Sequence, residues 1–225
     1  MKRSVQHLML ALVLLWPAIS QSNAAGRECN YGLVQDTDKV IANCTALIPT
    51  ESDPFHLSEY YAERCYAYTR NGEYERALAD CNEAIRLNSN YIALTFRGSV
   101  YDKMGNYDRA LADIDEALVE EFHAYGYSND ASRLSYRGTI YRHKGDYDRA
   151  IRDYDNAIAL VTMHIDNLEP QELAEMYNNR AFAKQAKGDI AGAEADFEEA
   201  TRNSLLIRCL FTAQFILPED CPYNR

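Results

Sequence analysis

The sequence predicts an all-α fold, an α-solenoid built from repeated pairs of helices. Four glycines share the same surroundings, and apolar or small residues recur three and four positions apart on both sides of each one. These glycines are Gly72, Gly105, Gly145 and Gly188. The 225 residues are 47% hydrophobic, which is enough apolar mass for one globular domain or a short repeat array.

A constant pattern surrounds each glycine. One alanine follows it by five residues and a second alanine by twelve. A tyrosine precedes each of the first three glycines by four residues, and Lys184 takes this place in the fourth unit. Each unit is therefore predicted to be two helices around a turn, with the glycine ending the first helix where a positive φ is often needed. Four matches in register disfavour the alternative of a generic helical bundle.

This pattern resembles the tetratricopeptide repeat, whose units are about 34 residues long. The early tryptophan of that family is replaced by Tyr61, Leu94, Leu134 and Tyr177. Residues 125–130 and 165–173 are insertions between units, and the usual proline between units is absent. The resemblance covers residues 58–207 and implies four units at about 58–90, 91–124, 131–164 and 174–207.

The first 24 residues are predicted to be a secretory signal peptide. Lys2 and Arg3 precede an apolar stretch at 8–19 that is too short to span a bilayer, and small residues end at Ala24. A retained anchor helix is disfavoured because the stretch is short and has no polar face. We expect a periplasmic or secreted protein with no membrane insertion after signal cleavage.

The segments that flank the array are predicted to be caps, which terminal repeats need for solubility. Residues 25–57 contain a half-unit at 36–48 that matches a second helix alone. Residues 208–225 form the expected C-terminal cap, and the apolar segment 204–217 breaks at Pro218. The alternative is that these segments form a dimerisation surface, so the partners include a possible homodimer.

The six cysteines are predicted to form disulfides, because an even count in an exported chain indicates a disulfide framework. Two of the pairs would close short loops at the chain ends, and the third would join facing helices of the first unit. The expected pairs are Cys29 with Cys44, Cys65 with Cys81, and Cys209 with Cys221. A bond between Cys44 and Cys65 is the main rival.

An arginine stands eight residues before each turn glycine and an aspartate stands eight after it. We interpret them as structural ion pairs between the two helices of each unit. The alternative is an anion-binding ladder, which is disfavoured because a functional cation needs no opposite charge at constant separation in every unit. The expected pairs are Arg64 with Asp80, Arg97 with Asp113, Arg137 with Asp153, and Arg180 with Asp196.

In proteins similar to this one, the first helix of each unit lines a concave groove. The lining places lie thirteen, ten, nine, six and two residues before the turn glycine. The expected partner-binding residues are Tyr66, Arg70, Phe96, Ser99, Lys103, Tyr136, Thr139, His143, Asn178, Asn179 and Phe182. Aromatic side chains among small polar groups suit recognition of an extended peptide or a helix.

Two points about this groove stay open. Phe96 and Tyr136 can instead pack between helices. Arg70, Lys103 and His143 form a weak cationic line that could meet an acidic or carboxylate-bearing segment, or could be solvated surface charges only.

Several functions are disfavoured. The net charge of −11 argues against nucleic-acid binding through a basic face. No nucleophile elbow, phosphate loop or HExxH motif is present, so we expect no enzyme, no metal and no cofactor. The residues with which chaperone adaptors of the family clamp a terminal carboxylate are also missing, because Ala62, Phe96 and Ser132 stand in such places.

The resemblance implies a protein-protein interaction scaffold that binds a peptide or protein segment in its groove. Small periplasmic members of the family in Gram-negative bacteria suggest a role in cell-envelope assembly or maintenance. The first alternative is a self-associating structural module, and the second is a regulator or enzyme acting on envelope polymers.

Overall fold

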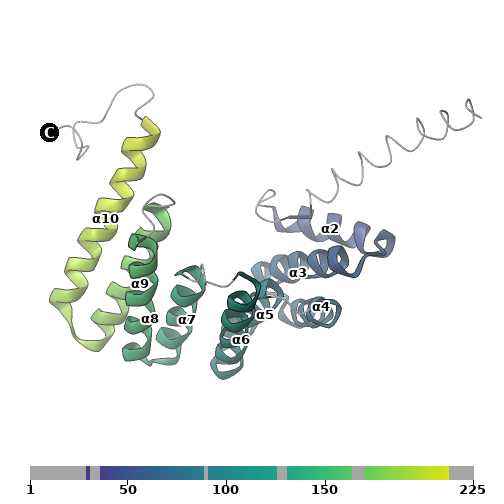
Figure 1. The fold of residues 1–225 in the computed structure, drawn as a ribbon, viewed down its shortest axis with the longest axis horizontal. Helices are drawn as coiled ribbons and strands as arrows, with labels where there is room; N and C mark the ends of the chain where they lie inside the picture. Colours follow the sequence, from purple (N-terminus) through teal and green to yellow (C-terminus); the bar gives the residue numbers. More distant parts are fainter. Residues whose placement is uncertain (1–28, 31–35, 89–90, 126–130, 164–169, 213–225) are drawn as a thin grey trace, which may run out of the picture. The chain divides into compact units, whose positions relative to one another are not determined.

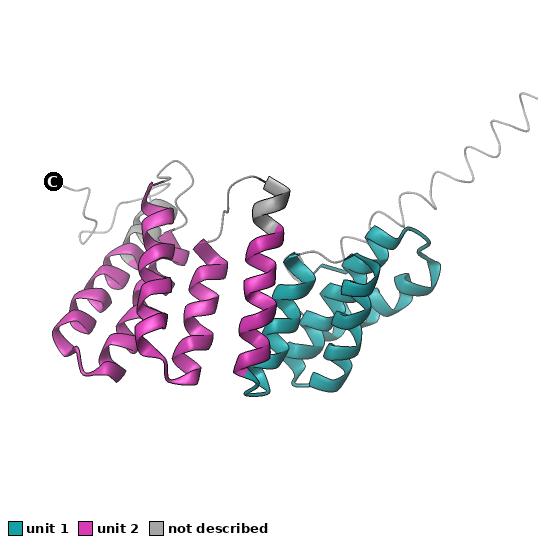
Figure 2. Ribbon diagram, turned by 60° about the horizontal axis from the view of Figure 1, so that its bottom comes forward, with its two compact units in different colours: residues 1–106 teal, residues 107–225 magenta. Residues whose placement is uncertain are grey.

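The computed structural model describes residues 29–30, 36–88, 91–125, 131–163 and 170–212, and every regular element in these ranges is a helix (Figure 1). The all-α prediction is confirmed. The chain divides into two compact units, residues 1–106 and 107–225 (Figure 2). The signal peptide expected at 1–24 lies outside the described residues.

The first unit begins with a single helix and continues with helix pairs. Its elements are α2 (Thr37–Leu47), the short 3-10 helix η1 (Ile48–Thr50), α3 (Pro54–Asn71), α4 (Tyr74–Leu87) and α5 (Tyr91–Lys103). α2 packs on α3, α3 packs on α4, and α5 contacts both α3 and α4. The helix at α2 is the half-unit expected at 36–48, where the side chain of Asp36 accepts a hydrogen bond from the Lys39 N–H at 3.2 Å.

The second unit repeats this arrangement. Its elements are α6 (Tyr107–Tyr125), α7 (Ala131–Lys144), α8 (Tyr147–Met163), α9 (Pro170–Lys187) and α10 (Ile190–Thr212). Each helix packs on the next along the chain, and α7 also contacts α9. α9 starts at Pro170, because the fixed φ of proline suits the first helical turn.

The four turn glycines end their helices in the left-handed region. Their φ values lie between 74° and 92°. At Gly72 the backbone N–H bonds to the Thr69 carbonyl at 3.1 Å, and the N–H of Glu73 bonds to the Tyr68 carbonyl at 2.9 Å. Two hydrogen bonds therefore satisfy the last carbonyls of α3, in a geometry that glycine adopts without a Cβ clash.

The small residues of the pattern allow the helices to approach closely. The alanines five and twelve residues after each glycine are at most 2% exposed. In the pair α7 and α8, a Cβ added to Gly138 would lie 3.0 Å from Tyr154 Cε1 and 3.1 Å from the Ala150 carbonyl oxygen. A small residue on the first helix therefore makes room for a large one on the second.

The C-terminal helix continues past residue 207, where the fourth predicted unit ends. α10 runs without a break from Ile190 to Thr212, so the apolar segment that begins at Ser204 continues the second helix of the last pair. Neither glycine nor proline occurs between Gly192 and Pro218, so no residue type that readily ends a helix falls there. Residues 213–225 lie outside the described part of the chain.

Two disulfides link described residues of the first unit. They connect Cys29 with Cys44 and Cys65 with Cys81, with Cα atoms 4.9 and 5.4 Å apart. Both agree with the expected pairings, and they exclude the rival bond between Cys44 and Cys65. The expected bond from Cys209 to Cys221 stays a prediction, because Cys221 is not among the described residues.

The two disulfides occupy related places. Cys44 and Cys81 each stand seven residues after the first residue of their helix, and both side chains are fully buried. Cys65 reaches Cys81 from the first helix of the same pair. In α2 the equivalent contact with Cys44 comes from Cys29, in the chain that precedes the helix.

We predict that replacing Cys65 and Cys81 together by alanine lowers the free energy of unfolding by about 3 kcal/mol, because the unfolded chain loses a cross-link that closes a loop of 16 residues. Urea unfolding followed by circular dichroism measures this change. Wild-type protein unfolded in the presence of a reductant is the control, and it should lose at least as much, because the reductant also opens the bond between Cys29 and Cys44. An unchanged unfolding midpoint for the variant would contradict the prediction.

Candidate partner-binding groove

Arginine side chains clamp the two helices of a pair together. In Arg64, Arg137 and Arg180, Nε and Nη2 donate to both oxygens of the aspartate sixteen residues later, at 2.7 to 2.9 Å. These aspartates are Asp80, Asp153 and Asp196, and each is at most 7% exposed. The two-pronged geometry matches the guanidinium to the carboxylate and is among the strongest ion pairs available to a protein.

The third nitrogen of each arginine reaches back to the preceding repeat. Nη1 of Arg137 bonds to Asp115 at 2.7 Å, and Nη1 of Arg180 bonds to Asp155 at 2.6 Å. In the first unit the acceptors are Thr45, 2.9 Å from Arg64, and Asn82, 3.0 Å from Arg97. Each of these arginines therefore bonds to the preceding repeat, and Arg64, Arg137 and Arg180 also pair within their own.

These acceptors were missed by the sequence analysis, although each stands eight residues after the first residue of its helix. They are Thr45 on α2, Asn82 on α4, Asp115 on α6 and Asp155 on α8. What they share is an oxygen that accepts a hydrogen bond, not a residue type. The expected pair of Arg97 with Asp113 would join residues of the two different units and stays a prediction.

The ion pairs of the clamps shift the pKa values of Arg64, Arg137 and Asp196. The hydrogen bond from Arg64 to Asp80 raises the pKa of Arg64, and the one to Asp153 raises the pKa of Arg137. Burial works against a charged Asp196, but hydrogen bonds from Arg180 and Lys184 outweigh it and hold the pKa of Asp196 below its ordinary value. Asp196 is therefore a carboxylate at neutral pH.

Lys184 stands where the other repeats have a tyrosine, and the structure explains this departure. In the earlier repeats Arg76 lies over the Tyr68 ring at 4.1 Å, and Arg149 lies over the Tyr141 ring at 4.6 Å. The last repeat has Gly192 in place of that second-helix arginine. Lys184 supplies the cation from the first helix instead, with Nζ 2.9 Å from Asp196 Oδ2.

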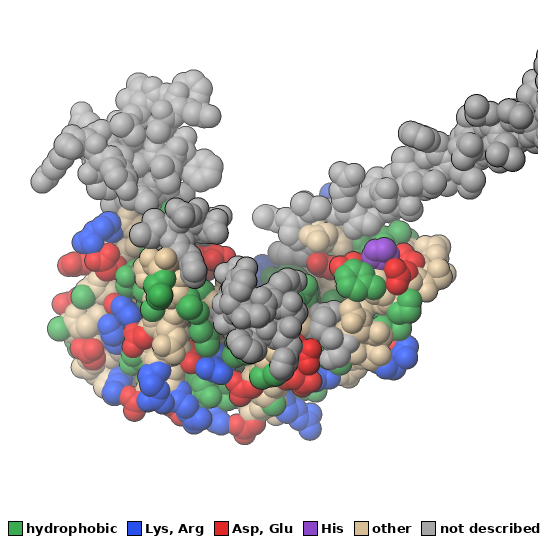
Figure 3. Space-filling model, viewed as in Figure 1, with side chains coloured by type: hydrophobic (Ala, Val, Ile, Leu, Met, Phe, Trp, Pro, Cys, Tyr) green, Lys and Arg blue, Asp and Glu red, His purple; other side chains and the backbone are tan. Residues whose placement is uncertain are grey.

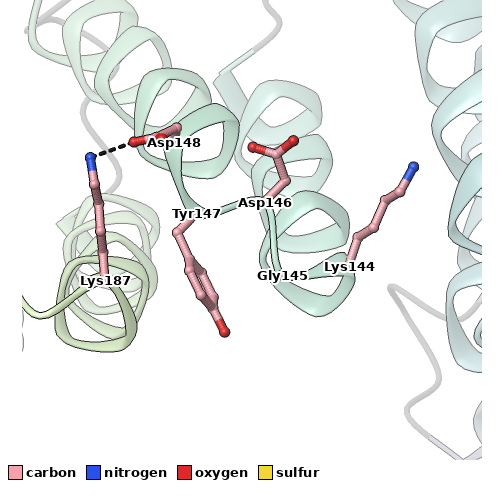
Figure 4. Close-up of a pocket in the computed structure, with 6 residues that line it drawn as sticks. All are labelled: Lys144, Gly145, Asp146, Tyr147, Asp148 and Lys187. Carbon is pink, nitrogen blue, oxygen red and sulfur yellow. Dashed lines mark hydrogen bonds and ion pairs between the residues drawn. The ribbon is translucent and has the colours of Figure 1, made fainter.

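The turn edge of the second unit carries a different set of ion pairs. Lys144 pairs with Asp108 of the preceding repeat. Lys187 likewise pairs with Asp148 (Figure 4). The space beside them has a volume of about 380 Å³ and is lined by Lys144, Asp146, Tyr147, Asp148 and Lys187 around Gly145. Charges of both signs gather along this edge (Figure 3), and these two ion pairs are exposed to solvent.

A groove lies between α7 and α9, the first helices of two successive pairs. It has a volume of about 260 Å³ and is lined by Ser132, Ser135, Tyr136, Thr139, Glu172, Glu175, Met176 and Asn179. On each helix these residues are spaced three, four and seven positions apart, which places them on one face. Six of them stand at places that the family resemblance assigns to the groove, including the expected partner-binding residues Tyr136, Thr139 and Asn179.

The groove has an apolar floor and a polar rim. Met176 is 3% exposed, and Tyr136 is half-buried beside it. Two hydrogen bonds fix the side chain of Thr139. Its Oγ1 lies 3.0 Å from the hydroxyl of Tyr154 and donates to the Ser135 carbonyl at 3.1 Å. This combination can receive an apolar or amphipathic side chain and hydrogen-bond the segment that carries it.

The sequence analysis missed Met176 and Glu172 as groove residues. Met176 stands twelve residues before the turn glycine and Glu172 stands sixteen before it. Both places fall outside the family's lining positions. Glu172 stands three residues before Glu175, and Met176 stands three before Asn179, and this helical spacing was the available signal.

The other expected binding residues do not line this groove. In the first unit Tyr66 and Phe96 pack against each other with ring centroids 4.9 Å apart, and Phe96 also packs on the buried core. The interpretation that Phe96 packs between helices is therefore the better one. Ser99 is half-buried on α5, and Arg70 and Lys103 are exposed at the ends of α3 and α5.

In the second unit three expected residues lie outside the lining of the groove. Phe182 is 49% exposed and contacts Phe197, with ring centroids 5.3 Å apart. His143 is exposed, with its ring 6.3 Å from that of Tyr107, and Asn178 is half-buried. They extend the same face of α7 and α9 beyond the groove.

Two further findings concern only the described residues. They contain no group of three or more His, Cys, Asp or Glu side chains placed to hold a metal ion. None of the described helices combines the length and the apolar composition needed to cross a membrane.

Comparison with protein families gives matches along most of the repeat array. Two models described as tetratricopeptide repeat match residues 58–91, 92–118 and 174–204, and residues 131–161, together more than half of the chain. A search of curated proteins gives no significant match.

Solved structures share the fold at low sequence identity. BtubC (BKLC) from P. vanneervenii is 17% identical with a TM-score of 0.67, over 89% of this chain and 92% of that one. A structure of MamA is 17% identical with a TM-score of 0.57, over 82% of this chain and 95% of that one. A putative kinesin light chain of Podosopora anserina is 15% identical with a TM-score of 0.58, over 82% and 93%.

We predict that Arg137→Ala lowers the free energy of unfolding by about 1–3 kcal/mol, because Asp153 stays buried without its cation. Urea unfolding measures the change. Arg202→Ala is the matched control, because that arginine is 61% exposed and pairs only with Glu199 on the surface, so it should cost less than about 0.5 kcal/mol. Equal losses in the two variants would contradict the clamp.

A second prediction concerns the stability of the fold at acidic pH. The pKa of Asp196 is lowered from 3.8, so its carboxylate stabilises the fold above that pH, and this stability is lost as the pH falls through the lower folded pKa. Asp196→Asn should therefore be less stable than wild type at about pH 6, and the difference should narrow below about pH 4. Urea unfolding midpoints across this range test it, with Glu198→Gln as the exposed control. A difference independent of pH would contradict the prediction.

Proposed function

The chain belongs to the tetratricopeptide-repeat family, and from that membership we propose that it is a protein-protein interaction scaffold that binds an extended peptide or protein segment. Members of this family generally bind other proteins, and catalysis is not a general property of the family. The binding surface is the first-helix face that carries Tyr136, Thr139 and Asn179, with the neighbouring Asn178, Phe182 and His143. The equivalent face of the first unit carries Tyr66, Phe96, Ser99, Arg70 and Lys103.

The groove between α7 and α9 is the observation that carries this proposal. Its volume of about 260 Å³ suits one or two side chains and is too small for a folded surface. Hydroxyl and amide groups surround an apolar floor, so a bound segment finds both a pocket for a side chain and partners for its main chain.

We further propose that the protein is exported and acts in the periplasm or outside the cell, in cell-envelope assembly or maintenance. The predicted signal peptide at 1–24 supports export. Two disulfides in the first unit fit an oxidising compartment, because reducing systems keep cytosolic thiols free. In this proposal residues 25–57 and 208–225 cap the repeats of 58–207.

Tyr136→Ala is expected to abolish capture of a partner, because it removes the largest side chain of the groove. Ser132→Trp should do the same by filling the groove from its exposed rim. In vivo crosslinking with mass spectrometry identifies the partner, and titration of the purified pair measures the loss in affinity, with circular dichroism to verify folding.

Phe55→Ala is the matched control for this experiment, because Phe55 is an aromatic residue that is 53% exposed and lies on α3 outside the groove. It should leave the affinity unchanged. If folded Tyr136→Ala and Ser132→Trp proteins bind the partner as tightly as wild type, the first-helix face of the second unit is not the binding site.

A further inference from the structure

The groove between α7 and α9 has walls of different character. The α7 wall presents the hydroxyl groups of Ser132, Ser135 and Thr139. The α9 wall presents Glu172 and Glu175, and both carboxylates are exposed at the rim. Among the described residues that line the groove, these glutamates are the two charged ones. A bound segment therefore meets negative charge on one side and neutral hydrogen-bonding groups on the other.

The negative charge is confined to one end of this face. Glu175 stands thirteen residues before Gly188, the place that Ser132 takes before Gly145. The glutamates therefore lie toward the starts of the two helices. His143 lies at the opposite end, two residues before the turn. Lysines at that end, Lys144 and Lys187, are paired with aspartates of the preceding repeats.

The floor of the groove suits an amphipathic side chain. Met176 is buried and Tyr136 is half-buried, so an aliphatic stem can lie on a thioether and an aromatic ring. Lysine and arginine side chains combine such a stem with a cationic head that stays in water. With the stem on this floor, the head reaches the rim where Glu172 and Glu175 stand.

We infer that the groove selects an extended segment that inserts a lysine or arginine side chain between α7 and α9. The stem packs on Tyr136 and Met176, and the head pairs with Glu172 and Glu175. This inference rests on the proposed function and adds the chemistry of the segment. The net charge of −11 acts in the same direction, because it attracts cationic partners to the whole protein.

Three capped nonapeptide libraries test the inference with the full chain. Their central residue is Lys, Gln or Glu, and all other positions are randomised among uncharged residues. Immobilised protein captures peptides from an equal mixture, and mass spectrometry counts the enrichment of each library. We expect the Lys library to be enriched about tenfold over the Glu library at low salt, the sum of two exposed ion pairs, and less so at high salt.

Two double variants assign the selectivity to the rim. Glu172→Gln with Glu175→Gln keeps the shape of the groove and should reduce the preference for Lys to about twofold or less. Glu194→Gln with Glu198→Gln is the matched control, because it removes the same charge from exposed positions on α10 outside the groove. It should keep the preference of the wild type.

The outcomes separate this inference from the proposed function. Enrichment of the Gln or Glu library that disappears in Tyr136→Ala would overturn the inference and keep the groove as a binding site. A preference for Lys that falls equally in both double variants would also overturn it, because net charge alone would then be the cause. Capture of all three libraries that is unchanged by Tyr136→Ala, or capture of none, would overturn the proposed function as well.

Discussion

The arginine clamp is the interaction on which the arrangement of the repeats depends. One guanidinium holds a buried aspartate of its own repeat with two nitrogens and an acceptor of the preceding repeat with the third. A buried carboxylate is costly to desolvate, so these pairs contribute little net stability compared with apolar packing. Their consequence is geometrical, because a planar fork with three satisfied donors fixes the angle and register of the helices that it joins.

The clamp also decides which face of the first helix is available for binding. Arg137 and Tyr136 are neighbours in α7, so their side chains point about 100° apart around the helix. Arg137 is turned toward α8 and the preceding helix pair, where its charge is matched. Tyr136, Thr139 and Ser132 are turned toward α9 and line the groove. Stability and recognition are therefore carried by different faces of one helix.

Much of the fold could be predicted from the sequence because its causes are local. A glycine with a positive φ, alanines at fixed distances from it and small residues opposite large ones each act within one repeat, and they identified the turns, the helix pairs and the pairing of Cys65 with Cys81.

The contacts between repeats could not be predicted in the same way. Each residue that accepts a hydrogen bond from the arginine of the next repeat has a side-chain oxygen, but the residue type varies, so no sequence motif predicts these acceptors. They are Thr45, Asn82, Asp115 and Asp155. The division of the chain at residue 106 leaves no mark in the repeat pattern either. In the groove, Met176 and Glu172 contribute because α7 and α9 lie side by side, which only the structure shows.

Site-specific photocrosslinking tests most directly the claim that the first-helix face of the second unit receives the partner. A photoreactive amino acid is placed at position 175 on the rim of the groove in one strain and at position 198 on α10 in another, both exposed and both replacing a glutamate. After irradiation of intact cells, the account predicts a covalent adduct of a discrete partner at position 175 and none at position 198. An adduct at position 198 alone would place the partner on the second helices and contradict the account.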